Sequence, residues 1–274
     1  MNFPFPLNNQ RGQIIDNASV RFSILEIASA TGALCALAGD PLFPSGDTTS
    51  PVEVPGPIGA SLLNISVEVI EKLLEICEQL DLVLSRCILK KLGINDSKYP
   101  AALCKVRSVV IQLPVNLTVV LLFIRFTSYL FHFCIQGSMD KCTTYKAETG
   151  VTKGNQSICL DEVSASLDFG RGQENRNIAD SVIPITAYLV EFVRVRDWTK
   201  FDTPRNLVLA MLGEVGELAE IMQWKGDFKE HDKIKNDKVI NKLSQEISDV
   251  AIYLLRVVWV CNLTDNLRQQ LSER

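Results

Sequence analysis

Four acidic side chains toward the C-terminus have the spacing and the surroundings of a metal-binding group. Glu214 and Glu217 are three residues apart, and Glu246 and Asp249 repeat that spacing further along the chain. Residues three apart share one face of an α-helix, and both pairs stand in apolar stretches that favour burial. Unpaired buried carboxylates are costly, so a cation, a basic partner or protonation must relieve them.

A divalent cation that prefers oxygen ligands is the simplest partner for such carboxylates, and Mg²⁺ also brings phosphate groups with it. The alternative is that the acids are solvated positions on amphipathic surface helices, which is the usual place of glutamates three or four apart. For a single pair, that alternative would be preferred. Two pairs inside apolar helices favour a magnesium site made by Glu214, Glu217, Glu246 and Asp249.

Three predicted helices carry these acids. An apolar helical period returns after residue 184 and predicts helices at residues 185–196, 203–224 and 237–262. Thr203 followed by Pro204 is a good start signal for the second helix, because threonine caps free N–H groups and proline suits the first helical position. The sequence therefore predicts an all-α fold.

The first half of the chain contains further helical sequence between irregular stretches. Residues 1–60 are rich in Pro, Gly, Ser and Thr, with helical character only at 24–38, and predict a mostly irregular leader. Residues 65–92 place apolar side chains at three- and four-residue steps, which predicts an amphipathic helix or two helices end to end. Residues 136–182 are polar and contain many glycines, which is typical of a linker or a long loop.

The composition excludes several classes of protein. A formal net charge of -4 and a pI near 5.4 give no basic surface for DNA or RNA. The eight cysteines include no C-x-x-C pair, and only two histidines accompany them, so neither a zinc site nor a disulfide framework is indicated. The N-terminus lacks the basic and apolar parts of a secretory signal. These features predict a cytoplasmic protein without a nucleic-acid partner.

One apolar run raises the question of a membrane. It covers residues 109–124 and continues to residue 135 only across Arg125. A membrane span needs about 20 apolar residues, and a charge at that depth is expensive. The run is therefore more typical of a buried segment, and membrane association stands only as a third hypothesis.

The sequence around the acids resembles the MazG-like all-α NTP pyrophosphatases, and their dCTP pyrophosphatase branch in particular. The acids themselves form the E-x-x-E and E-x-x-D motifs of that family. The surrounding matches are Arg196-Asp197-Trp198, PRNL at 204–207, GEVGELAE at 213–220, QWK at 223–225 and E-x-SD-V-x-IYL at 246–254.

This resemblance implies a helical bundle that assembles as a homo-oligomer. It also implies hydrolysis of a (deoxy)nucleoside triphosphate, such as dCTP or a related pyrimidine nucleotide, to monophosphate and pyrophosphate, with the four acids holding Mg²⁺ on the triphosphate. Trp198, Trp224 and Tyr253 stand where the family has the aromatic residues of its nucleotide pocket. By residue type alone, each is more often core packing or a surface cap.

The order of the motifs departs from the family. The family closes with a K-x-x-x-N-x-x-K/R-Y-P segment, whose lysine and asparagine are expected near the phosphates. This chain has that segment ahead of the acids, with Lys91, Asn95, Lys98, Tyr99 and Pro100 at the matching positions. Two explanations stand: the chain joins the tail of one unit to the head of a second, or its reading frame crosses noncoding sequence.

Two further departures concern the base. Leu189 and Asp202 stand where the dCTP branch tends to carry histidines. The resemblance therefore does not carry over the recognition of cytosine.

These features divide the chain into four parts. They are a leader at 1–60, a helical segment resembling the family's C-terminal part at 61–104, an apolar run and polar linker at 105–182, and a MazG-like catalytic core at 183–274. The helical segment could dock on the core within one chain or between subunits, since the cost of loop closure grows only with the logarithm of length. The alternative function is a non-catalytic relative, whose incomplete bundle binds nucleotide or partner subunits without turnover.

Overall fold

The described part of the protein is entirely helical. In this computed structural model it comprises residues 17–44, 51–101, 104, 160, 163, 178–224 and 237–274. Seven α-helices and one short 3₁₀ helix lie within these residues, which contain no strand. The all-α fold expected from the sequence is therefore confirmed.

The chain divides into two compact units. The first unit comprises residues 1–101 and 158–274, and the second comprises residues 102–157. Cys104 is the one residue of the second unit that the structure describes. All of the helices discussed below belong to the first unit.

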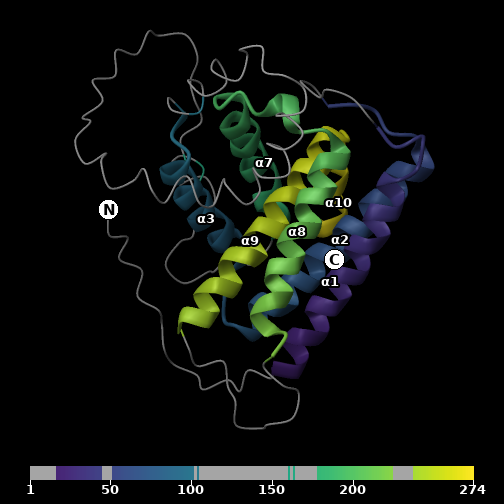
Figure 1. The fold of residues 1–274 in the computed structure, drawn as a ribbon. Coiled ribbons are helices and arrows are strands. Elements are labelled where there is room, and N and C mark those ends of the chain that lie inside the picture. The colour runs from purple at the N-terminus through teal and green to yellow at the C-terminus, as the bar shows by residue number, and fades with distance from the viewer. Residues whose placement is uncertain are drawn as a thin grey trace, which may run out of the picture. The chain divides into compact units, whose positions relative to one another are not determined.

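Four long helices form the centre of the first unit. Helix α1 (Asn17–Ala38) packs against α2 (Gly56–Gln79), and α8 (Pro204–Met222) packs against α9 (Asp237–Val260). Helix α1 also packs against α8, and α2 packs against α9, so each of the four helices has two of the others as neighbours (Figure 1).

Three shorter helices surround this group. Helix α3 (Leu84–Lys98) packs on α9 and on α7 (Ile178–Arg194), whereas α10 (Thr264–Ser272) packs on α7 and α2. The 3₁₀ helix η2 (Thr199–Phe201) links α7 to α8. The segment that resembles the family's closing motif therefore docks within the same chain, on a helix that carries two of the acids.

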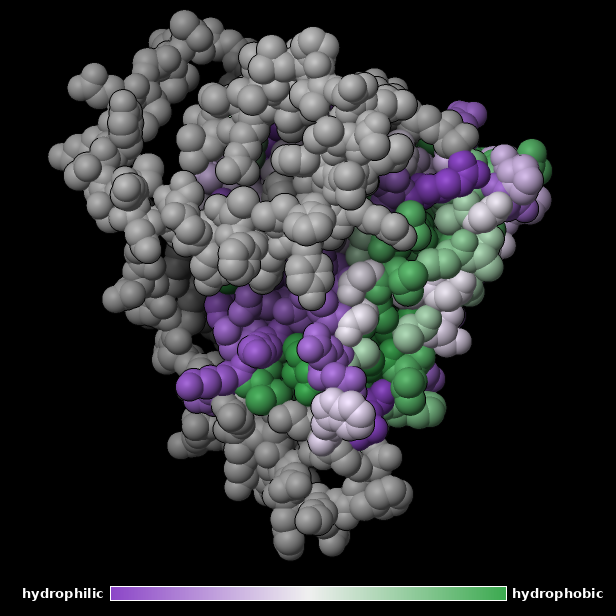
Figure 2. Space-filling model, viewed as in Figure 1, coloured by the Kyte–Doolittle hydropathy of each residue, from purple (hydrophilic) through white to green (hydrophobic). Residues whose placement is uncertain are grey.

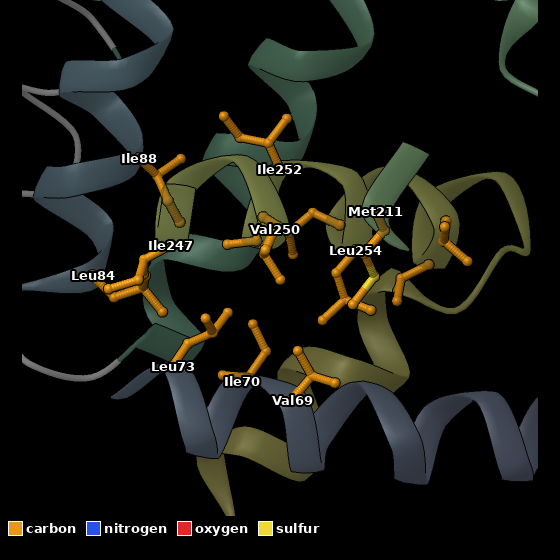
Figure 3. Packing of buried hydrophobic residues seen from close by; sticks show 14 of the residues in the cluster. Val69, Ile70, Leu73, Leu84, Ile88, Met211, Ile247, Val250, Ile252 and Leu254 are labelled. Carbon is orange, nitrogen blue, oxygen red and sulfur yellow. The ribbon is translucent and has the colours of Figure 1, made fainter. Parts of the chain in front are cut away.

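Aliphatic side chains from α2, α3, α8 and α9 fill the core. Along α9, Leu243, Ile247, Val250 and Leu254 are buried at three- and four-residue steps, which places them on one face. Figure 3 shows side chains of α2, α3 and α9 pointing toward one another, with Met211 of α8 beside them. Burial of each such side chain contributes about 1.5–3 kcal/mol, so this face fixes α9 against its neighbours.

The helix bounds differ from the predicted ones for local reasons. The helix predicted at 185–196 begins earlier, at Ile178, and carries Pro184 inside its first two turns. The segment predicted at 65–92 forms two helices, α2 and α3, which are separated at a left-handed Asp81 (φ 54°). Helix α8 begins where the sequence indicates, because the Thr203 hydroxyl accepts a hydrogen bond from the N–H of Asn206.

The helical character predicted at residues 24–38 is confirmed, although helix α1 begins earlier than expected, at Asn17. Residues 56–60, which the sequence predicts to be irregular, belong to the start of α2. Helix α1 buries Val20, Ile24 and Ile27 at helical steps, but its other face is also apolar, with Phe22 62% and Leu25 68% exposed. An amphipathic period is therefore weak in this part of the sequence, and it does not indicate where the helix begins.

The exposed apolar side chains of α1 continue onto α8. On the face shown in Figure 2, hydrophobic residues gather over these two helices. Helix α1 has the length and hydropathy that would suit a membrane span over Ala18–Ala38, although in this structure it packs against α2 and α8. The apolar run at residues 109–135 lies outside the described residues.

Arg205, from the PRNL motif, fastens α8 to the end of α1. Its guanidinium donates hydrogen bonds to the backbone oxygens of Ala38 (2.8 Å), Asp40 (3.0 Å) and Phe43 (3.2 Å). These are carbonyls at and beyond a helix end, which lack partners within the helix.

Methionine at position 205 is expected to lower the free energy of unfolding by about 1–3 kcal/mol, as measured by urea denaturation. The matched control is Arg268→Met on the exposed side of α10, and equal effects of the two substitutions would contradict the capping role.

Candidate metal centre

Carboxylate groups from α8 and α9 converge on one point. Glu214 and Glu217 of α8 and Glu246 of α9 each offer an oxygen, and these oxygens all lie within 4.8 Å of one another. The convergence follows from the sequence, because the two helices pack together and each presents acids three residues apart on one face. Three of the four predicted metal ligands are thus brought together.

The fourth predicted ligand, Asp249, lies one turn beyond Glu246 and has a basic partner. Its carboxylate forms an ion pair with the ammonium of Lys91 on α3, and these two side chains keep only 12% and 14% of their surface exposed. Lys91 therefore brings a positive charge from the permuted segment to the edge of the acidic cluster.

Burial and mutual repulsion make these carboxyl groups reluctant to ionise. The pKa of Glu214 is raised to about 8, first by burial and then by the charges of Asp249, Glu217 and Glu246. Burial also raises the pKa of Glu246 and of Asp249, while the charge of Lys91 opposes both shifts. If all of these carboxyl groups were ionised, the cluster would hold more negative charge than the surrounding protein stabilises.

The donor set fits a hard divalent cation. All of its ligand atoms are carboxylate oxygens, the type that Mg²⁺ and Mn²⁺ prefer, and it contains no thiolate or imidazole that would favour a softer metal. A divalent ion would relieve the cost of ionising Glu214. Glu214, Glu217 and Glu246 are the residues that would hold it, with Asp249 beside them.

Two of the predicted pocket aromatics lie on the same side of the bundle as Lys91. Trp198 is half-buried and meets the ring of Tyr99 edge to face at 5.4 Å between centroids, and the ring of Phe192 at 5.9 Å. The phenol of Tyr253, on α9, has its pKa raised by burial and also by the nearby charges of Glu214 and Asp249. Tyr253 therefore lies near the acids, and Trp198 packs against the end of the permuted segment.

The other two predicted substrate contacts occupy different surroundings. Asn95 is half-buried on α3, one turn beyond Lys91. Trp224 comes just after the C-terminus of α8 and is 88% exposed, whereas Trp198 precedes the N-terminus of that helix. A helix of 19 residues spans roughly 28 Å, so the described residues do not bring the two tryptophans together.

Arg196, from the motif that also contains Trp198, ties α3 to α7. It is 2% exposed, and its guanidinium donates to the backbone oxygens of Tyr99 (2.7 Å) and Phe192 (2.9 Å) and to the carboxylate of Asp96 (2.6 Å). The guanidinium also lies 3.5 Å from the centroid of the Phe192 ring. One arginine thus holds the end of the helix that carries Lys91.

Replacement of Arg196 by methionine is expected to lower the free energy of unfolding by about 1–3 kcal/mol, because the carbonyls of Phe192 and Tyr99 lose a charged donor. Urea denaturation measures this effect, with Arg194→Met, an exposed arginine two residues earlier at the end of α7, as the control. A loss no larger than that of the control would show that α3 is held by its apolar contacts alone.

Sequence reasoning missed a second buried ion pair, between Asp202 and Arg256. Arg256 on α9 binds both oxygens of Asp202, and burial raises the pKa of Asp202 although the charge of Arg256 opposes the shift. The guanidinium also lies 5.1 Å from the ring centroid of Tyr253. Asp202, one of the departures from the family pattern, therefore has a structural partner that holds α9 against the start of α8. No spacing in the sequence signals this pairing.

The described unit, all-α with a carboxylate cluster shared by two packed helices, is consistent with the helical fold of the MazG-like NTP pyrophosphatases. Comparison with curated proteins agrees, since part of the chain is homologous to dCTP pyrophosphatase 1, a MazG-like NTP pyrophosphatase.

The homologous part is short. The protein from Rattus norvegicus is 47% identical over 73 residues, and that from Homo sapiens is 45% identical over the same length. The match covers 27% of this chain and 43% of each relative, so the chain spans less than half the length of the curated relatives it matches. No protein-family model matches the chain, and no solved structure matches it significantly.

Proposed function

We propose that this protein is a magnesium-dependent nucleoside triphosphate pyrophosphatase, which hydrolyses dCTP or a related pyrimidine nucleotide to the monophosphate and pyrophosphate. The observation that carries the proposal is the convergence of Glu214, Glu217 and Glu246 within 4.8 Å, with Asp249 and Lys91 beside them. Partial homology to dCTP pyrophosphatase 1 supports the same class of activity.

The chemistry asks for positioning more than for covalent catalysis. When bound, Mg²⁺ would polarise a phosphoryl oxygen and neutralise charge on the triphosphate. Glu214, Glu217, Glu246 and Asp249 would hold it in place, and an acid of this set would orient the attacking water. Lys91 would release Asp249 and approach the phosphates. Its positive charge would then offset the negative charge of the leaving pyrophosphate.

For the base we propose the aromatic side chains near the acids as the contact surface. Tyr253 and Trp198 supply faces on which a nucleobase can stack, and Asn95 on α3 supplies an amide close to Lys91. Trp224 is 88% exposed after the C-terminus of α8, so the described residues do not place it on this surface. The preference for dCTP is proposed from the partial homology to dCTP pyrophosphatase 1.

Lys91 also bears on the non-catalytic alternative. That alternative rests on the closing segment standing ahead of the acids in the sequence. Because α3 docks on α9 and pairs Lys91 with Asp249, the segment reaches the acids within one chain. This placement favours the catalytic proposal.

The proposal is tested by measuring pyrophosphate release from a panel of ribo- and deoxyribonucleoside triphosphates with Mg²⁺, with Mn²⁺ and with EDTA. Release that requires the metal and is strongest for a pyrimidine nucleotide is the expected result. The double variant Glu214→Gln, Glu217→Gln is expected to lose activity by about 1,000-fold or more. A folded wild-type chain that releases no pyrophosphate but binds dCTP in calorimetry would instead support the non-catalytic relative.

Homo-oligomeric assembly and a cytoplasmic location remain parts of this proposal. The assembly is implied by the family resemblance, and the exposed apolar side chains of α1 and α8 are compatible with it. Light scattering on the purified chain would measure its mass in solution, and a monomer at micromolar concentration would remove assembly from the proposal.

A further inference from the structure

Helices α2 and α9 have the same length and the same relation to the next helix in the chain. Each has 24 residues, and adding 181 to both bounds of Gly56–Gln79 gives the bounds of Asp237–Val260. A short connection leads from each of them to a shorter helix, which starts at Leu84 after α2 and at Thr264 after α9.

The turns after these two helices are also the same. Asp81 and Asn262, which differ by 181 positions, both adopt a left-handed backbone with φ of 54° and 56°. Few residues other than glycine adopt this conformation, and Asn and Asp are the commonest of them. The same shift relates the backbone hydrogen bonds Leu80 N–H to Ile76 O (3.0 Å) and Cys261 N–H to Val257 O (3.1 Å), and Leu82 N–H to Cys77 O (2.8 Å) and Leu263 N–H to Val258 O (3.0 Å).

Helices α1 and α8 correspond in their turn, with a shift of 184. Seven buried positions of α1 fall on seven buried positions of α8. Four positions also carry the same residue: Arg21 and Arg205, Leu25 and Leu209, Gly32 and Gly216, Leu34 and Leu218. The buried pairs are Val20 with Pro204, Ser23 with Leu207, Ile24 with Val208, Ile27 with Met211, Thr31 with Val215, Leu34 with Leu218, and Ala38 with Met222.

The packing of the helices follows the same correspondence. Helix α1 packs on α2 as α8 packs on α9, and the corresponding helices α1 and α8, and α2 and α9, pack on each other. The shorter helix that follows α2 packs on α9, and the shorter helix that follows α9 packs on α2 (α3 and α10, respectively). This reciprocal packing is the arrangement expected of two copies related by an approximate two-fold axis.

We infer that this protein contains two copies of one helical unit, α1–α2–α3 and α8–α9–α10, and that only the second copy keeps a metal site. In the first copy, Ala30 and Ala33 stand at the positions of Glu214 and Glu217. Ile65 stands at the position of Glu246, and Glu68 at the position of Asp249. The first copy thus retains one acid of four.

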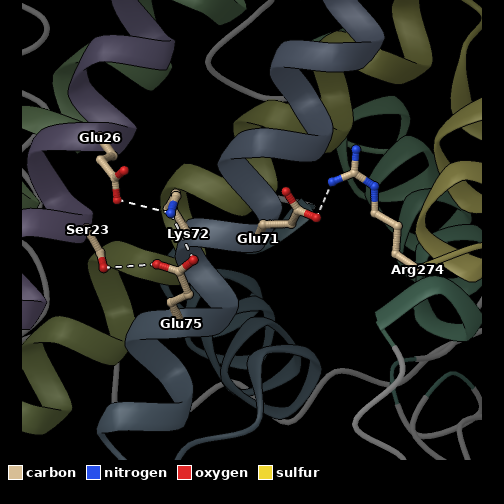
Figure 4. A network of polar contacts seen from close by, with 6 residues as sticks. All are labelled: Ser23, Glu26, Glu71, Lys72, Glu75 and Arg274. Atoms are coloured by element: carbon tan, nitrogen blue, oxygen red, sulfur yellow. Dashed lines mark hydrogen bonds and ion pairs between the residues drawn. The ribbon is translucent and has the colours of Figure 1, made fainter.

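The polar contacts of the first copy agree with the loss of its site. Lys72 and Glu75 stand at the positions of Tyr253, which lies near the acids of the second copy, and of Arg256, which pairs with Asp202. In the first copy Lys72 binds Glu26 (3.1 Å) and Glu75 (2.8 Å), and Ser23 donates to Glu75 (3.3 Å), as Figure 4 shows. These contacts join α1 to α2 by ion pairing within the protein and leave no acidic cluster among the described residues there.

The role that remains for the first copy is to supply α3. That helix brings Lys91 to Asp249 of the second copy, and the corresponding helix of the second copy, α10, ends at Ser272. One chain therefore provides both halves of a single site. This role rests on the proposed function, whereas the duplication itself rests on helix bounds, backbone angles and burial.

The test is to restore the lost acids. The starting point is the full chain that already carries Glu214→Gln and Glu217→Gln. It receives the substitutions Ala30→Glu, Ala33→Glu and Ile65→Glu, which together with the native Glu68 complete a set of four acids. Binding of Mn²⁺ is followed by electron paramagnetic resonance, and circular dichroism and thermal melting verify folding. The parent double variant is expected to bind no Mn²⁺, and the restored chain to bind it within about tenfold of the native affinity.

A second restored chain omits the substitution at the buried Ala30, because a glutamate there could prevent folding. Ala33 is exposed and Ile65 is half-buried at the edge of the core, so this chain presents three acids without placing one at a fully buried position. The matched control places glutamates at the neighbouring exposed positions Ser29, Gly32 and Asn64, where a Cβ on Gly32 meets nothing within 4 Å. A chain with acids at these positions is expected to bind no Mn²⁺.

The outcomes separate the two proposals. Mn²⁺ binding by a restored chain, and none by the shifted control, supports the duplication whatever the native chain does. Folded restored chains that bind no Mn²⁺, or bind no more than the control, overturn it. Failure of the native chain to bind Mn²⁺ counts against the proposed function alone.

Discussion

Asparagine in place of Asp249 is expected to reduce metal-dependent pyrophosphate release by about 100- to 1,000-fold. Asp249 is placed to serve two purposes, because it stands beside the three converging glutamates and holds Lys91. Asparagine has nearly the same shape, so packing is kept while the charge is removed. Initial rates with a pyrimidine triphosphate at saturating Mg²⁺ measure the loss.

The control for this substitution is Glu68→Gln, at the corresponding exposed position of the first copy. It removes one charge from the other half of the fold and is expected to leave the rate within about twofold, as surface substitutions usually do. A double variant separates the two purposes of Asp249. If the carboxylate acts partly by holding Lys91, then Lys91→Met adds little in the Asp249→Asn background but costs much alone. Equal activity of Asp249→Asn and Glu68→Gln would exclude Asp249 from the site.

The placement of the acids could be predicted from the sequence because it depends on local geometry. A spacing of three fixes Glu214 beside Glu217, and Glu246 beside Asp249, as soon as the segments are helical. Their apolar surroundings then turn both pairs inward. The convergence of the two pairs needs only that two helices adjacent in the sequence pack together, as consecutive elements usually do.

Contacts between distant segments could not be predicted in the same way. The pairing of Asp202 with Arg256 joins residues 54 positions apart, and no period in the sequence relates them. The position of Lys91 was expected from a family resemblance, but its docking on α9 depends on the packing of α3 and on Arg196. The start of α1, before residue 24, escaped prediction because apolar residues cover both the buried and the exposed faces of this helix.

The free energy of unfolding of the metal-free protein is expected to fall as the pH rises from about 5 to above 8. Glu214 has a pKa of about 8 in the folded chain, against 4.5 as its ordinary value. Between these values the folded chain keeps a proton that the unfolded chain has lost, so raising the pH favours unfolding. The raised pKa values of Glu246 and Asp249 act in the same direction.

Glutamine at position 214 is expected to remove most of this dependence, because its side chain stays neutral at every pH. The variant should match the wild type near pH 5 and exceed it near pH 8.5. The difference is on the order of 2 kcal/mol, with allowance for the remaining solvent contact of the side chain and for repulsion shared among neighbours. Urea denaturation in EDTA across this range measures it. The control is Glu220→Gln, an exposed site further along α8, which should show the same pH dependence as the wild type.

At high pH, magnesium is expected to make the wild type more stable than Glu214→Gln, which is the reverse of the order expected without metal. A divalent ion must displace the proton of Glu214, so its affinity should rise with pH by up to about tenfold per unit until the pH passes 8. Bound ion stabilises the folded state by mass action, and the variant has lost a ligand. Near pH 8.5, excess Mg²⁺ should therefore stabilise the wild type more than Glu214→Gln. An equal gain for both chains would mean that the ion binds elsewhere, and that the raised pKa of Glu214 reflects burial without a metal-binding role.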